Sequence, residues 1–312
     1  MRERLDPDMA EAMAFEAARD AGLPPPVDLD EERARGRDAA AFWNEGLPEM
    51  AAIEDHVVAG PEGPVPVRVF KPVDSGPLPV MLYIHGGGWV VGSVVQNEPL
   101  IRTLAARSGW AIAAPTYRLA PEHPYPAGLD DNIAAGQWLQ NEGAAHGLDA
   151  SRMVVSGTSA GGNLALAAAV SGRLEALAGL VLFYGVFGAD LDTASYRRFA
   201  DGRFGLSRER MAYFLDLYDP TGRHRTDPLL QPLLAELAGL PPTWLLAAGL
   251  DVLRSDTLAL HSRLIEAGVR STLHVEPGVV HGFINRGRMV GAARRSLDGA
   301  AHFLRSLTRD TP

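Results

Sequence analysis

The chain has 312 residues, of which 46% are hydrophobic and 21% charged, values typical of a globular protein with one large domain and an appended part. Its formal net charge of -9 disfavours binding to nucleic acid, because a phosphate-binding surface needs clustered Lys and Arg. The absence of Cys excludes disulfides, thiolate-bound zinc and a cysteine nucleophile.

The N-terminal region, residues 1–45, begins with a charged and polar stretch that does not resemble a signal peptide. Apolar residues such as Met9 and Phe15 then stand among charged ones in a helical pattern, which three prolines at 24–26 interrupt. A second helix is predicted over residues 31–43. No part of the sequence reaches the roughly 18 consecutive apolar residues of a membrane span. We therefore expect a cytoplasmic protein without a membrane segment.

From residue 53 onward, short apolar runs alternate with helical stretches, which is typical of a wound α/β sheet. Because most of these runs are continuously apolar, we predict a mostly parallel sheet that is buried on both faces. Val57 and the run 65–70 alternate in polarity and predict an antiparallel leading edge. Residues 187–230 interrupt the alternation and are predicted to be an insertion. The predicted strands are 65–70, 80–85, 111–116, 153–156, 179–184, 243–248 and 271–275, and the predicted crossover helices are 100–107, 133–139, 164–170 and 258–267.

Three successive glycines follow the predicted strand 80–85, in the motif His85-Gly86-Gly87-Gly88-Trp89. Glycines are costly in a packed fold, but they let backbone N–H groups point at a carbonyl oxygen as it becomes an oxyanion. The alternative is an ordinary glycine turn in which His85 is a core or solvent-exposed histidine.

A second motif, Gly157-Thr158-Ser159-Ala160-Gly161-Gly162, lies between the predicted strand 153–156 and a helical run. A sharp strand-to-helix turn needs small residues on both sides of an exposed serine, and the helix amides favour developing negative charge. The motif therefore predicts that Ser159 is a nucleophile and that the N–H of Ala160 is an oxyanion donor. A plain tight turn is the alternative, whereas a phosphate loop would need Gly-Lys-Ser/Thr, which is absent.

An acid and then a histidine follow the serine in folds of this kind. Asp251 lies just beyond the predicted strand 243–248 and is chosen as the acid. Asp256 lies where the next helix begins and is interpreted as a helix cap. His281 follows the strand 271–275 in a loop with room to reach Ser159, so it is chosen as the base. The other late histidines, which fall inside predicted helices or a strand, are His261, His274 and His302.

Motifs for other chemistry are missing from the sequence. It contains no His-Glu-x-x-His zinc motif, and no predicted strand is followed by Gly-x-Gly-x-x-Gly. We therefore expect neither a metal nor a dissociable cofactor.

These motifs, together with Tyr117-Arg-Leu-Ala-Pro-Glu-His-Pro-Tyr-Pro126, resemble the hormone-sensitive lipase family of α/β-hydrolases, especially its bacterial carboxylesterases. Thr158 is typical of a subgroup, since many relatives have Asp at this position. The segment 251–256 departs at three places from the family pattern Asp-Pro-Leu-Arg-Asp-Glu, but it retains the first acid.

The resemblance implies an α/β-hydrolase fold with a mostly parallel sheet of about eight strands, flanked by helices. The core would consist of residues 46–186 and 231–312. A helical cap would be built from residues 1–45 and from the insertion 187–230. Relatives are commonly dimers, so a homodimer is also expected.

The resemblance further implies a role for each candidate residue. Ser159 would attack an ester carbonyl, His281 would move the proton, and Asp251 would hold the imidazole in the required tautomer. Trp89 would either line the substrate pocket or have a structural role. The oxyanion hole would be formed by the amides of Gly87, Gly88 and Ala160.

The predicted function is hydrolysis of small carboxylic esters with short to medium acyl chains, through an acyl-enzyme. The short-chain preference follows from the many charged residues of the expected cap, which suit a solvated lid better than a lipid-docking surface. Lactone or amide hydrolysis and acyl transfer by the same residues are alternatives. A non-catalytic receptor is a further alternative, but related receptors lack the histidine that this chain retains at His281.

Overall fold

The computed structural model describes residues 4–309. Residues 1–3 of the predicted segment 1–45 and residues 310–312 of the predicted segment 231–312 lie outside the described residues. The N-terminal part forms two helices, α1 (Pro7–Asp20) and α2 (Leu29–Trp43), as the apolar pattern predicted. Aspartates cap both of them. The Asp6 carboxylate accepts from the N–H of Asp8 at 3.0 Å, and the Asp28 carboxylate accepts from the N–H of Glu31 at 2.8 Å.

One sheet of eight strands runs through the molecule in the order β1-β2-β4-β3-β5-β6-β7-β8. β1 and β2 pair antiparallel, β2 also pairs antiparallel with β4, and all later pairs are parallel. The predicted α/β class, strand number and antiparallel edge are therefore confirmed. The strands are β1 (Ala52–Gly60), β2 (Gly63–Lys71), β3 (Leu78–Ile84), β4 (Ala111–Pro115), β5 (Leu148–Thr158), β6 (Gly179–Phe183), β7 (Thr243–Leu250) and β8 (Ser271–Val280).

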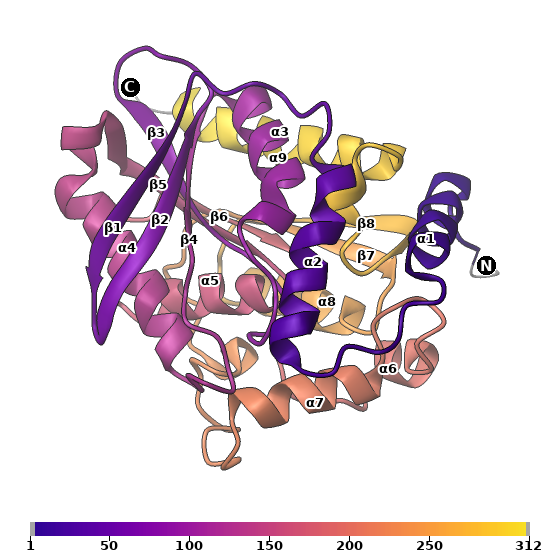
Figure 1. Ribbon diagram of the computed structural model, residues 1–312. Helices are drawn as coiled ribbons and strands as arrows, with labels where there is room; N and C mark the ends of the chain where they lie inside the picture. Colours follow the sequence, from indigo (N-terminus) through magenta and orange to yellow (C-terminus); the bar gives the residue numbers. More distant parts are fainter. Residues whose placement is uncertain (1–3, 310–312) are drawn as a thin grey trace.

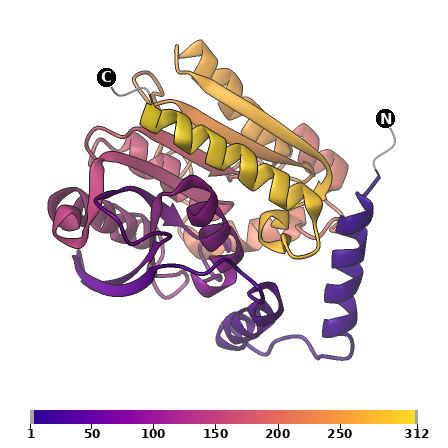
Figure 2. The ribbon, with the colours of Figure 1, turned by 90° about the horizontal axis from the view of Figure 1, so that it is seen from above.

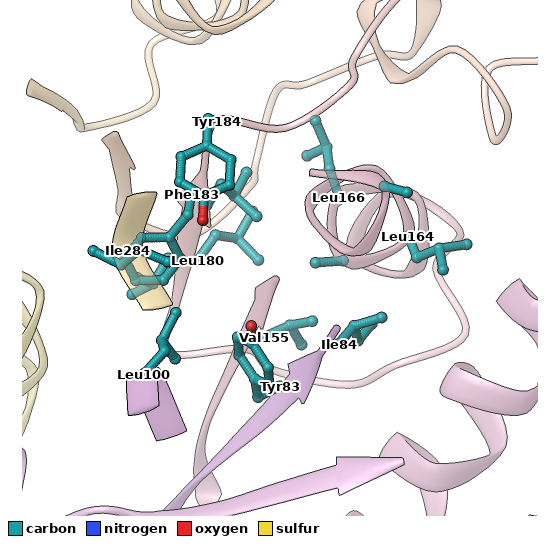
Figure 3. Packing of buried hydrophobic residues seen from close by; sticks show 14 of the residues in the cluster. Tyr83, Ile84, Leu100, Val155, Leu164, Leu166, Leu180, Phe183, Tyr184 and Ile284 are labelled. Atoms are coloured by element: carbon teal, nitrogen blue, oxygen red, sulfur yellow. The ribbon is translucent and has the colours of Figure 1, made fainter. Parts of the chain in front are cut away.

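Helices cover both faces of this sheet (Figures 1 and 2). α3 (Glu98–Ser108) and α9 (Gly291–Arg309) pack together on one face, whereas α4 (Ala127–Glu142), α5 (Ala160–Val170) and α8 (Arg254–Glu266) lie on the other. Figure 3 shows Leu100 of α3 and Leu164 of α5 approaching the strands from opposite sides. The central strands are therefore buried on both faces, as their continuous apolar character requires.

The insertion between β6 and β7 contains two helices, α6 (Ala194–Phe199) and α7 (Arg208–Tyr218). Its two ends meet at Asn163 of α5, whose side-chain amide donates to the carbonyls of Val186 and Leu230, each at 2.9 Å. The N–H of Leu233 also donates to the carbonyl of Phe187 at 2.9 Å. The inserted segment therefore leaves the core and rejoins it at one place.

Short 3-10 helices complete the fold at η1 (Val95–Asn97), η2 (Gly143–His146), η3 (Pro232–Leu234) and η4 (Phe283–Arg286). In Figure 1 the lower end of α2 approaches α7, and an ion pair between Glu32 and Arg210 joins the two helices. Among the helices of residues 4–309, none combines the length and apolar character needed to cross a membrane.

Candidate active site

Ser159 stands between β5 and α5 with φ 54° and ψ -123°, a conformation that residues with a side chain rarely adopt. The tight turn needs glycine beside it. A Cβ atom on Gly161 would lie 2.1 Å from the backbone oxygen of Ile84, so no larger residue fits there. The motif around Ser159 therefore forms the sharp strand-to-helix turn that its sequence predicted.

His281 and Asp251 follow the C-terminal ends of β8 and β7, next to Ser159. The imidazole Nε2 lies 2.9 Å from Ser159 Oγ, and Nδ1 lies 2.7 Å from Asp251 Oδ2. The other carboxylate oxygen of Asp251 accepts from the N–H of Leu253 at 3.0 Å. Because a carboxylate only accepts, Nδ1 carries the proton and Nε2 presents its lone pair to the serine hydroxyl. The structure thus brings together the three side chains chosen from the sequence.

The glycines after β3 form a loop that lines the same cavity as Ser159. Gly87 has φ +125°, and a Cβ there would lie 2.0 Å from the backbone oxygen of Val91, so the loop requires glycine. Within residues 4–309, the N–H groups of Gly87, Gly88 and Ala160 donate no hydrogen bond. These amides are therefore free to receive an oxygen atom bound at Ser159.

His85, at the start of this loop, is a core residue and not a second base. Its ring stacks on Tyr117 with centroids 4.4 Å apart, and Nδ1 lies 2.8 Å from the carbonyl of Gly86. Burial lowers the pKa of His85 to about 4, so its imidazole is neutral near pH 7. The Tyr117 hydroxyl donates to the carbonyl of His85 at 2.9 Å, which links the segment 117–126 to the glycine loop.

Trp89 does not line the cavity, so its pocket assignment is corrected in favour of the structural alternative. Its ring is 1% exposed and stacks on Tyr218 at the end of α7, with centroids 4.5 Å apart and planes inclined by 2°. The carbonyl of Trp89 also accepts from the N–H of Ala120 at 2.9 Å. Trp89 therefore attaches the inserted segment to the glycine loop.

Asp256 is not the helix cap predicted from its position. α8 begins at Arg254, and the Asp256 carboxylate reaches across to accept from the backbone N–H groups of Phe187 and Gly188, each at 2.9 Å. Burial raises the pKa of Asp256 to about 7, although the two N–H donors act in the opposite direction. The sequence offered no sign of this role, because the partners lie 68 and 69 residues away.

A cavity of about 530 Å³ opens above Ser159. Its apolar walls come from the α2 residues Ala39, Ala40 and Trp43 and the α7 residues Met211 and Phe214. Two ion pairs were not foreseen, since they join residues 178 and 270 positions apart: Arg210 with Glu32, and Arg286 with Glu16. Besides these apolar walls and the four ion-paired residues, the cavity is lined by Arg19, Gly36, Gly86, Gly87, Gly88, Val91, Gly92, Gln96, Asn97, Thr158, Ser159, Tyr184, Gly205, Leu206, His281, Gly282 and Asn285.

The part of the chain that the structure describes contains no group of three or more His, Asp or Glu side chains arranged to hold a metal ion. The groups gathered at Ser159 are its hydroxyl, an imidazole, a carboxylate and backbone amides.

The known proteins that this chain resembles are ester hydrolases with the α/β-hydrolase fold. A family model described as the α/β hydrolase fold matches residues 81–285. The carboxylesterase NlhH of Mycobacterium tuberculosis is 40% identical over 257 residues, which cover 79% of this chain and 80% of that protein. The ethyl acetate hydrolase of Pseudomonas putida is 33% identical over 306 residues, covering 94% of this chain and 96% of that protein.

Among solved structures, an ester hydrolase from the metagenome of Lake Arreo, EH1AB1, superimposes with a TM-score of 0.92 and 33% identity over 98% of this chain and 99% of that chain. That enzyme was solved in complex with a bipyridine phosphonate derivative. The chain therefore belongs to the hormone-sensitive lipase-like carboxylesterases, a family of carboxylic ester hydrolases with the α/β-hydrolase fold.

Proposed function

We propose that this protein hydrolyses small carboxylic esters through a covalent acyl-enzyme on Ser159. The observation that carries the proposal is the continuous contact from Ser159 Oγ to His281 at 2.9 Å and from His281 to Asp251 at 2.7 Å. The proposal is also supported by the amides of Gly87, Gly88 and Ala160, which donate no hydrogen bond among residues 4–309 and would serve as oxyanion donors.

In the first half-reaction, Ser159 Oγ attacks the ester carbonyl while His281 Nε2 takes the hydroxyl proton. Asp251 holds Nδ1–H and stabilises the imidazolium that forms. The carbonyl oxygen becomes an oxyanion, which accepts hydrogen bonds from the amides of Gly87, Gly88 and Ala160. The tetrahedral intermediate then collapses, and the departing alkoxide receives the proton from His281 and leaves as the alcohol.

In the second half-reaction, a water molecule attacks the acyl carbonyl and gives a proton to His281. The same amides stabilise the second oxyanion. Its collapse breaks the bond to Ser159 Oγ, which takes the proton back from His281, and the carboxylic acid is released. No further reactant is required.

Residues 1–45 and 187–230 are proposed to form a cap over the cavity, with the core made of residues 46–186 and 231–312. Two facts support this division: α2 and α7 both contribute cavity walls, and the Glu32–Arg210 ion pair joins these two helices. A cavity of about 530 Å³ under such a cap suits short to medium acyl chains.

Covalent labelling tests the proposed reaction. A p-nitrophenyl alkylphosphonate should release p-nitrophenol and leave one phosphonyl group on Ser159, located by peptide mass spectrometry. Ser159→Ala protein, folded as judged by circular dichroism, should remain unlabelled. Labelling at another residue, or no labelling of an active wild-type enzyme, would contradict the proposal.

A homodimer, a cytoplasmic location and the absence of a cofactor stay predictions from the sequence. Sedimentation velocity measures the first of these directly, since a dimer has twice the mass of the 33.4 kDa chain.

A further inference from the structure

Thr158, the residue before the nucleophile, is the centre of a buried hydrogen-bond network. Its hydroxyl oxygen accepts from the N–H of Gly86 at 3.1 Å and lies 3.1 Å from the Tyr83 hydroxyl. Tyr83 in turn donates to the side-chain oxygen of Asn97 at 2.7 Å, and the Asn285 amide donates to that same oxygen at 3.0 Å. Thr158 is 3% exposed and Tyr83 is fully buried.

The direction of each hydrogen bond in this network is fixed. Asn97 offers only an oxygen to Tyr83, so the single hydroxyl proton of Tyr83 points at Asn97. The Tyr83 oxygen must therefore accept from Thr158, whose lone pair remains for the N–H of Gly86. Burial raises the pKa of Tyr83, which keeps this proton in place. The Asn97 amide is itself anchored, because it donates to the carbonyl of Ser93 at 2.9 Å.

The network joins three separate segments of the proposed active site. Thr158 lies on the turn that carries Ser159, Gly86 begins the glycine loop with the unpaired amides, and Asn285 lies in η4, just after His281. The Asn285 oxygen also accepts from the N–H of Leu100 at 3.2 Å, which fixes this end of the network to α3.

We propose that Thr158 is a positioning residue, which sets the distance between the glycine-loop amides and Ser159 by holding the N–H of Gly86. This inference rests on the proposed function. Glycine can adopt many backbone conformations, so the loop 86–88 needs contacts with other segments to hold its amides in the positions that the proposed oxyanion requires. Oxyanion donors act only when they are held in place before the reaction, because small displacements weaken them in the transition state.

The test compares Thr158→Val, which keeps the shape of the side chain but removes both hydrogen bonds, with Thr158→Ser, which keeps both. We expect Thr158→Val to lower kcat on p-nitrophenyl butyrate by roughly ten- to a hundredfold, with KM changed by less than about threefold. Thr158→Ser should keep kcat within about threefold of the wild type. Tyr83→Phe, which leaves the bond to Gly86 but removes the acceptor for Thr158, should lower kcat by roughly three- to tenfold.

A second measurement separates positioning from general destabilisation. A boronic acid forms a tetrahedral adduct with the serine, so its inhibition constant should rise by the factor by which kcat falls. The matched control is Thr243→Val at the opposite end of the sheet, where the buried Thr243 hydroxyl donates to the carbonyl of Pro241 at 3.0 Å. Thr243→Val should lower thermal stability and leave kcat unchanged.

The inference is overturned if Thr158→Val keeps the wild-type kcat. It is also overturned if Thr158→Ser or Thr243→Val loses as much kcat as Thr158→Val does. If Thr158→Val does not fold, Thr158→Ala, which also removes both hydrogen bonds, takes its place, and an unchanged kcat in that variant overturns the inference. A wild-type protein that neither hydrolyses esters nor reacts with the phosphonate would instead overturn the proposed function, and this inference with it.

Discussion

Ser159 occupies a backbone conformation of high energy, and two residues near it, Trp89 and Tyr184, also have positive φ. Conformations of this kind cost on the order of 1–3 kcal/mol each and persist only where the surroundings hold them. Here the N–H of Ser159 donates to the carbonyl of Phe183 at 3.0 Å, and its own carbonyl accepts from Val186 at 3.3 Å. The strained turn is therefore fastened to β6, and this keeps the hydroxyl facing His281.

The first prediction concerns Ser159 and His281. Ser159→Ala and His281→Ala should each lower kcat by about 10⁴-fold or more and leave the fold intact, because members of a triad act as a unit. The double mutant should lose no more activity than either single mutant. Steady-state hydrolysis of p-nitrophenyl butyrate, with circular dichroism as the folding control, measures this. Retention of a tenth of the wild-type kcat in a folded single mutant would mean that the residues are misassigned.

The second prediction contrasts the two neighbouring acids. Asp251→Asn should lower kcat by about 10⁴-fold, because an amide no longer holds the imidazole in the working tautomer. Asp256→Asn should keep most of the activity, since an amide oxygen can still accept from Phe187 and Gly188. The two substitutions are chemically identical and serve as each other's control. Similar losses of kcat at both positions would argue against Asp251 as the acid.

The third prediction concerns the stability of the fold and follows from the raised pKa of Asp256. The pKa is about 7 in the folded protein and about 4 in an unfolded chain, so only the folded state holds this proton between those pH values. The resulting stabilisation is complete below pH about 4 and is lost as pH rises through 7. Wild-type Tm should therefore fall relative to that of Asp256→Asn by roughly several degrees from pH 4 to 8. Parallel Tm curves in differential scanning calorimetry would contradict this.

At the scale of elements, Arg33 joins α2 to the core. Its guanidinium donates to both carboxylate oxygens of Glu122 at 2.7 and 2.8 Å, and to the carbonyls of Val90 and Ala120 at 2.9 and 3.0 Å. Glu122 belongs to the segment 117–126, which the resemblance singled out without a role. The pairing with Arg33 lowers the pKa of Glu122 to about 2. One side chain thus ties a cavity wall to the core.

The fourth prediction tests this attachment with Arg33→Met. The walls supplied by α2 contact the substrate in the ground state and in the transition state alike, so loosening them should act mainly on KM. We expect KM for p-nitrophenyl butyrate to rise by roughly three- to tenfold, with kcat within about threefold of the wild type. Arg37→Met, at an exposed position of the same helix, should change neither value. A loss confined to kcat would argue against the attachment.

The elements that the sequence predicted well are those with a strong local pattern. β3, β6 and β7 are almost entirely apolar, as is the run 153–155 within β5, and the two glycine motifs need their small residues for steric reasons that are visible in the local sequence. The first half of β5 contains Asp149 and Arg152 and lacks this pattern, so the strand predicted at 153–156 began five residues late. β1 was recognised only through Val57, because its polarity alternates and it lies at an edge of the sheet. β8 extends to Val280, so His281 follows its strand directly.

The features that could not be predicted depend on contacts between distant segments. Asp256 looked like a helix cap because its partners, Phe187 and Gly188, belong to another part of the chain. Trp89 was assigned to a pocket because its stacking partner, Tyr218, lies far away in the sequence. The hydroxyl of Thr158 likewise acquires its partners only when β3 and β5 pair.

At the scale of the whole molecule, the size of the cavity sets the fifth prediction. Each added methylene gains roughly 0.8 kcal/mol of burial until the space is filled, after which further carbons stay in water or force strain. With about 530 Å³ available, kcat/KM should peak between acetyl and hexanoyl esters and then fall. The measurement uses p-nitrophenyl esters from acetate to palmitate with detergent controls. A maximum at palmitate with activation at an oil–water interface would indicate a lipase.

The two ends of the inserted segment meet at a single amide, since Asn163 donates to both Val186 and Leu230 at 2.9 Å. Because the segment 187–230 leaves and rejoins the core at one place, it can act as a cassette, that is, a segment that can be exchanged for another without moving the core. Its length can change at little entropic cost, because loop closure depends only slowly on the number of residues. Substrate range can therefore diversify, in evolution or in the laboratory, by recombining this cassette while the serine, histidine and aspartate keep their places.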